Sequence, residues 1–156
     1  MDEQLIATTY PVVELDFTEV RLTRDWTYPG RCLLISQEEY HDLQDMSADD
    51  YLLMMMEVRQ VTQVLANLYG ADKMNVASFG NVVPWLHWHI IPRHVGDAAW
   101  PATPWENTGA SVEADEDTLV HHAERIEWAI LDADLADEDD DEDEFEDDDE
   151  FDEDMG

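Results

Sequence analysis

The stretch that decides the fold is WLHWHIIPRH, residues 85–94. It is rich in aromatic and β-branched residues, which favour a β-strand. Side chains of a strand alternate between its two faces, so His87 and His89 point to the same face. The opposite face is apolar and suits a core; it carries Leu86, Trp88 and Ile90. The sequence therefore predicts a half-buried strand with two imidazoles on one side.

Two imidazoles on one strand face leave three interpretations open. They can be sheet histidines without a role. They can bind zinc together with His94, because imidazole is a common zinc ligand. They can also carry out nucleophilic phosphoryl chemistry, because a neutral imidazole is a nucleophile and an imidazolium is an acid near neutral pH. The residues around the pair are needed to choose among these.

Outward from this strand, the sequence predicts a hairpin, a long helix and a further strand. Residues 20–23 and 32–36 are expected to form two strands around a turn at Pro29-Gly30. The next segment is an amphipathic helix that begins after Ser47 and ends at Gly70. Its apolar face recurs at helical spacing: Met54, Val58, Val61, Leu65 and Leu68.

Three further segments complete the outline. A strand is predicted at residues 73–78, directly upstream of the 86–91 strand. A last helix is predicted at residues 117–131, with a single apolar face. That face consists of Leu119, Ala123, Ile126 and Ile130. Residues 1–19 show no pattern that assigns them to a helix or a strand.

The charge of the chain is strongly uneven. The net charge is -33, and residues 132–154 contain 18 acidic residues and no basic one. Self-repulsion and sparse apolar content predict a disordered acidic tail at 132–156, after a domain at 1–131. The domain itself is also acidic, which disfavours polynucleotide binding. This acidity fits a salt-rich cytoplasm and ordinary acidic solubility equally well.

Composition also limits the cellular setting. There is no apolar run of 18 residues, so no membrane span is expected. The N-terminal MDEQLIATTY lacks the pattern of a secretory signal, which favours a cytoplasmic protein. Cys32 is the one cysteine, so no intramolecular disulfide can form.

Several ordered motifs make the chain resemble the histidine-triad (HIT) family. The family signature is a strand of alternating histidines, followed in one branch by two apolar residues and Pro-Arg. Here His89 is followed by Ile-Ile-Pro-Arg. Upstream, an Asn-x-x-x-x-Gly segment runs from Asn75 to Gly80, and His41-Asp-Leu precedes the long helix. The resemblance aligns His87 and His89 with the second and third triad positions and Trp85 with the first, which departs from the family's histidine.

The resemblance implies a role for each site residue. His87 is the expected nucleophile, with one ring nitrogen held by a backbone carbonyl. His89 is expected to contact a non-bridging phosphate oxygen or to act as an acid. The expected nucleotide contacts are backbone amides at Gly80, the side chains of Asn75 and Asn81, a guanidinium–phosphate contact from Arg93, and a ribose contact from Asp25.

The resemblance also implies a fold and a function. It predicts an α+β fold with an antiparallel sheet of about five strands, one long helix and one C-terminal helix, assembled as a homodimer. The expected activity is hydrolysis or transfer at a nucleoside–phosphate linkage, such as a dinucleoside polyphosphate or a nucleotide phosphoramidate. It needs no metal or cofactor. The alternative is a catalytically weak nucleotide-binding module, which the replacement at Trp85 favours.

Overall fold

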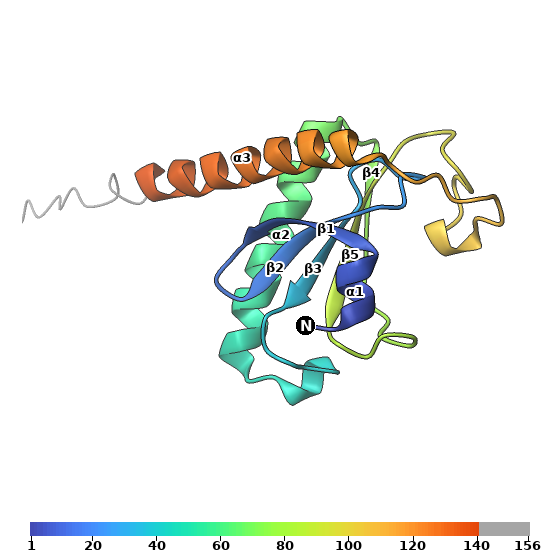
Figure 1. Cartoon of the computed structure of the whole chain (residues 1–156). Helices are drawn as coiled ribbons and strands as arrows, with labels where there is room; N and C mark the ends of the chain where they lie inside the picture. Colours follow the sequence, from blue (N-terminus) through green and yellow to red (C-terminus); the bar gives the residue numbers. More distant parts are fainter. Residues whose placement is uncertain (141–156) are drawn as a thin grey trace, which may run out of the picture.

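The computed structural model describes the backbone of residues 1–140 and the side chains of residues 1–133 (Figure 1). Its centre is one antiparallel sheet in the order β1-β2-β3-β5-β4. The strands are β1 (Thr9–Glu14), β2 (Thr18–Thr23), β3 (Cys32–Ser36), β4 (Lys73–Ala77) and β5 (His87–Arg93). β5, which carries both histidines, pairs with β3 on one side and β4 on the other. The α+β fold with a five-stranded antiparallel sheet is confirmed.

The long helix α2 (Ala48–Tyr69) has the ends that the sequence predicts. The Ser47 hydroxyl accepts the backbone N–H of Asp50 at 3.1 Å, which satisfies one of the free donors of the first turn. Gly70 ends the helix in the left-handed region, at φ 56°. Both expected caps are confirmed.

The main core lies between one face of the sheet and the helices α2 and α3 (Glu116–Asp140). Leu34 and Ile90 of the sheet are fully buried there, as are Val61 of α2 and Ile126 of α3. The four apolar residues predicted for the last helix are all buried. The long C-terminal helix crosses α2, and Figure 1 shows both packed on the same side of the sheet.

The opposite face of the sheet has a smaller cluster beneath the N-terminal helix α1 (Glu3–Ala7). Leu5 of α1 packs there with Leu33 and Ile35 of β3 and with Val83. The face therefore remains partly open between α1, the loop before β5 and the short 3-10 helix η2 (Pro104–Glu106). A second 3-10 helix, η1 (Leu43–Asp45), precedes α2.

Two segments differ from the expectations. Residues 1–19, where no helix or strand is predicted, contain α1, β1 and the start of β2. Helix α3 continues to Asp140 instead of ending near residue 131, because no glycine or proline interrupts it. The start of the predicted tail is thus helical, and residues 141–156 lie outside the described part, so disorder of the tail stays a prediction. None of the described helices is long and apolar enough to cross a membrane.

Candidate active site

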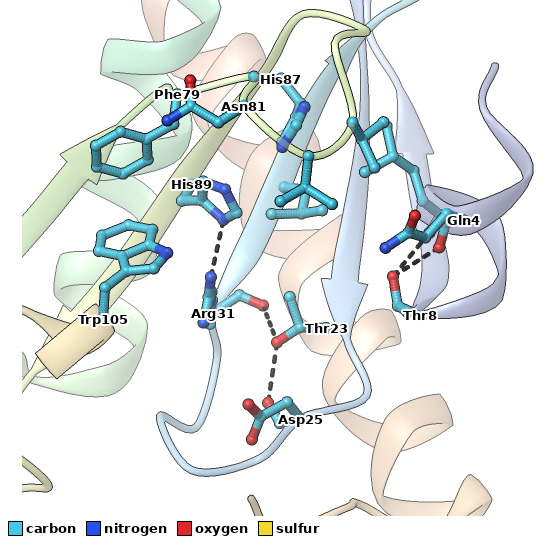
Figure 2. Close-up of a pocket in the computed structure, with 15 residues that line it drawn as sticks. Gln4, Thr8, Thr23, Asp25, Arg31, Phe79, Asn81, His87, His89 and Trp105 are labelled. Atoms are coloured by element: carbon cyan, nitrogen blue, oxygen red, sulfur yellow. Dashed lines mark hydrogen bonds between the residues drawn. The ribbon is translucent and has the colours of Figure 1, made fainter. Parts of the chain in front are cut away.

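A cavity of about 650 Å³ opens on the sheet face opposite α2 (Figure 2). Strands β3 and β5 form its floor, through Leu33 and the two histidines. Its walls are α1, the loop at residues 79–83 and η2. A volume of this size accommodates a nucleotide-sized ligand. The predicted strand alternation therefore brings His87 and His89 into one concave site.

His87 is held in one tautomer by the backbone. Its Nδ1 lies 2.6 Å from the carbonyl oxygen of Trp85, and the side chain is buried. Because a carbonyl oxygen only accepts, Nδ1 carries the proton and Nε2 carries the lone pair. This is the arrangement that a nucleophilic imidazole needs.

His89 is held in the opposite tautomer by a different partner. Its Nδ1 lies 2.9 Å from Nη2 of Arg31, and a guanidinium can only donate. Nδ1 is therefore the acceptor and Nε2–H is a donor. Burial, together with the positive charge of Arg31 and the neighbouring His87, lowers the pKa of His89 to about 3. His89 is neutral at pH 7, and its ring centroid lies 5.0 Å from that of His87.

Three more of the predicted residues line the same cavity. Gly80 and Asn81 lie in the loop beside the histidines, and Asp25 lies at another part of the wall. Gly80 has φ +67°, a conformation that side-chain-bearing residues rarely adopt. The Asp25 carboxylate accepts the N–H and the hydroxyl of Thr27 through Oδ1, at 3.0 and 2.6 Å, which fixes its orientation.

The structure does not bring Arg93 and Asn75 to the cavity. Arg93 is fully buried, and its guanidinium binds both carboxylate oxygens of Asp97 at 2.7 and 2.8 Å. It also donates to Asn75 Oδ1 and to the backbone carbonyls of Ala98 and Ala102. These contacts use all five donors of a guanidinium, so none is left for a phosphate. The expected phosphate contacts of Arg93 and Asn75 are corrected: both residues hold the loop after β5.

The geometry also disfavours the zinc interpretation. His94 lies beyond the end of β5, and its Nε2 is 3.0 Å from the carbonyl oxygen of Tyr69. It therefore does not converge with His87 and His89. In the described part of the chain, no three histidine, cysteine or acidic side chains form a metal-binding group.

Several cavity residues are not among the residues predicted for the site. Arg31 is one of them, although strand alternation places it on the same side as Leu33 and His89. Trp105 of η2 contacts His89 edge to face, with ring centroids 5.2 Å apart. Gln4 and Thr8 belong to the unassigned N-terminal segment, and no local pattern brings them to the site.

Trp85 lies just before β5 and packs against the cluster on the cavity side of the sheet. Its indole N–H donates to the carbonyl oxygen of Ser36 at 2.8 Å. The side chain thus ties the loop to the end of β3, while its own carbonyl holds His87.

Comparison with known proteins agrees with this geometry. The model of the HIT domain family matches residues 7–96. A bis(5'-nucleosyl)-tetraphosphatase [asymmetrical] of Schizosaccharomyces pombe is 29% identical over 107 residues, covering 62% of this chain and 59% of the relative. The match therefore spans less than two thirds of that curated relative.

Two bacterial crystal structures share the fold over most of their length. A histidine triad protein from Bradyrhizobium japonicum has a TM-score of 0.78 and 27% identity, covering 83% of this chain and 96% of its own. A histidine triad protein from Marinobacter aquaeolei VT8 has a TM-score of 0.79 and 28% identity, covering 85% and 96%. The paired histidines on β5, the fold around them and the family match lead to one conclusion: the chain belongs to the HIT domain family.

Proposed function

We propose that the protein is a nucleotide hydrolase or nucleotidyl transferase that cleaves a nucleoside–phosphate linkage through a covalent intermediate on His87. The observation that carries this proposal is the 2.6 Å contact between His87 Nδ1 and the Trp85 carbonyl oxygen. It leaves the Nε2 lone pair of a neutral imidazole available in a cavity of nucleotide size. The relative in S. pombe that is named a bis(5'-nucleosyl)-tetraphosphatase supports the same reaction class.

The reaction then has two steps. The Nε2 atom of His87 attacks the α-phosphorus, a P–N bond forms, and the bond from phosphorus to the leaving oxygen or nitrogen breaks. The leaving group takes a proton from solvent. The oxygen of water, or of another acceptor, then attacks phosphorus and loses its proton to solvent. The P–N bond breaks, which releases the nucleotide and restores neutral His87.

We assign His89 the role of donating a hydrogen bond to a phosphate oxygen. Its Nε2–H is a donor, and its pKa of about 3 makes it a poor proton donor to a leaving group at pH 7. Of the two roles expected for His89, the hydrogen bond to a non-bridging oxygen is therefore the one proposed. Backbone amides near Gly80 and the Asn81 side chain complete the phosphate contacts, and Asp25 is assigned to the ribose.

A catalytically weak nucleotide-binding module is the second candidate. Trp85 favours it, because the indole donates to Ser36 and offers no acceptor to the site. In either case we propose a small nucleotide as the ligand, and no polynucleotide, because a chain with net charge -33 repels one. A homodimer in the cytoplasm remains part of the proposal.

A hydrolysis screen distinguishes the two candidates. Wild type and His87→Ala are compared on adenosine and guanosine dinucleotides, nucleotide phosphoramidates and mononucleotides. The hydrolase proposal predicts that wild type turns over at least one of them and that His87→Ala, folded to the same extent, does not. Binding of nucleotides without turnover of any would favour the binding module.

A further inference from the structure

Arg31 occupies a central place in the cavity that no motif explains. It directly precedes β3 and lies on the cavity side, between His89 and the part of the wall that carries Asp25 (Figure 2). Its Nη2 donates to His89 Nδ1 at 2.9 Å. Its guanidinium carbon lies 5.5 Å from the ring centroid of Trp105, which covers it from one side.

The charge of Arg31 lacks a partner. No carboxylate of the described residues lies within ion-pair distance of it, whereas Arg93 has Asp97. The Nε of Arg31 is buried with no hydrogen-bond acceptor among those residues. Burial lowers the pKa of this guanidinium, and the carboxylate of Asp25 offsets this only in part. A charge held in this way raises the free energy of the empty site, and an anionic ligand would compensate it.

The Nη1 group of Arg31 has no protein partner among the contacts of the described residues either, and the residue lines the cavity. One guanidinium can therefore make two kinds of contact at once. Nη2–H holds His89 in its Nε2–H tautomer, and the remaining donors can meet phosphate oxygens next to His87. The planar guanidinium of arginine has several donors and can make both contacts at once. The ammonium of a lysine is a single point charge and is less suited to making both.

We propose that Arg31 is the positioning residue of this site: it fixes the tautomer of His89 and anchors the anionic phosphoryl group that His87 attacks. The inference rests on the proposed function for the identity of the ligand. It also defines the ligand class more closely. A ligand must bring a negatively charged phosphate to Arg31, so an uncharged nucleoside should bind much more weakly than its monophosphate.

The test uses binding and NMR, neither of which depends on turnover. Dissociation constants for AMP and for adenosine are measured by calorimetry on wild type, Arg31→Met and Arg31→Lys. The ¹⁵N chemical shifts of the His89 ring give its tautomer in each protein. Arg24→Gln is the matched control, because Arg24 belongs to the same hairpin connection but does not line the cavity.

Arg31→Met should weaken AMP binding about 10- to 100-fold, the range expected for losing hydrogen bonds to a charged group. It should also change the His89 ring shifts, while adenosine binding stays similar. Arg31→Lys should recover only part of the AMP affinity, because an ammonium restores the charge but not the set of guanidinium donors, and Arg24→Gln should behave as wild type. The unfolding midpoint of Arg31→Met should not fall, because the change removes an unpaired charge.

Three results would overturn the inference: wild-type AMP affinity in Arg31→Met, wild-type His89 ring shifts in Arg31→Met, or a wild-type protein that binds AMP no more tightly than adenosine. A different result would contradict the proposed function: a wild-type protein that turns over none of the nucleotides in the substrate screen. A protein that binds AMP through Arg31 but hydrolyses nothing would retain this inference and lose the hydrolase proposal.

Discussion

At the scale of single residues, the site depends on what holds each imidazole. A backbone carbonyl holds His87 and a guanidinium holds His89, so the two rings are held in opposite tautomers: Nδ1–H in His87 and Nε2–H in His89. The sequence predicted the pair, the backbone carbonyl and the cavity side of β5. It could not predict the guanidinium, because Arg31 and His89 are 58 positions apart and meet only when β3 pairs with β5.

The lowered pKa of His89 predicts a pH dependence of stability. In the unfolded chain this ring gains a proton near pH 6.5, while in the folded protein it does so only near pH 3. Between these values the unfolded state binds more protons, so stability falls as the pH decreases. Urea unfolding at pH 4.5 and 7.5 should show a smaller difference for His89→Gln than for wild type. Equal differences would mean that His89 titrates normally in the folded protein.

Trp85 provides a second prediction at this scale. Trp85→His should stay folded and keep or raise turnover, because an imidazole can donate to Ser36 as the indole does. Trp85→Ala should unfold more easily, by about 2 kcal/mol, because it removes a half-buried ring and a hydrogen bond. Turnover and unfolding midpoints of both variants check this. A folded but inactive Trp85→His would show that the alignment of Trp85 with the first triad position is wrong.

At the scale of elements, the helices and strands with a strong hydrophobic periodicity were predicted correctly, and those without it were not predicted. The face of α2, its two caps and the four strands from β2 to β5 follow from local patterns and are confirmed. β1 is an edge strand with Pro11 next to an irregularity in its pairing, and α1 has five residues. Such elements depend on tertiary contacts, which a local pattern does not contain. Because α1 was not predicted from the sequence, its residues in the cavity were not predicted either.

The loop after β5 gives a prediction about elements. Asp97→Ala should lower the free energy of unfolding by about 3 kcal/mol or more, because it leaves the fully buried Arg93 without its carboxylate. Chemical denaturation measures this. Glu116→Ala is the matched control, since it breaks the exposed pair with Arg24 and should cost less than about 1 kcal/mol. Equal small losses in both would mean that the Arg93 network does not anchor the loop.

At the scale of the whole molecule, the acidic charge and the site are separated along the chain. The described residues that line the cavity lie between Gln4 and Trp105, whereas the densest acidic run begins at residue 132. The part of that run in α3 extends the helix past the core. Among the described residues, the sheet and the residues that line the cavity all precede α3.

Deleting residues 141–156 should accordingly leave the unfolding midpoint and the nucleotide affinity nearly unchanged at moderate salt. Twelve of the 16 deleted residues are acidic and only three are apolar, too few to form a core. Thermal unfolding and AMP calorimetry of the full-length and shortened proteins check this. A large loss of stability in the shortened protein would show that the segment docks on the domain.

His87 is proposed to become covalently nucleotidylated during turnover, and intact-mass spectrometry detects that adduct itself. Wild type, His89→Gln and His87→Ala are mixed with an adenosine phosphoramidate or dinucleoside polyphosphate and quenched at millisecond to second times. We predict a mass increase of one AMP group on wild type, localised to His87 by peptide mapping, and no increase on His87→Ala. Turnover without any adduct on His87, or an adduct that persists in His87→Ala, would show that His87 is not the nucleophile.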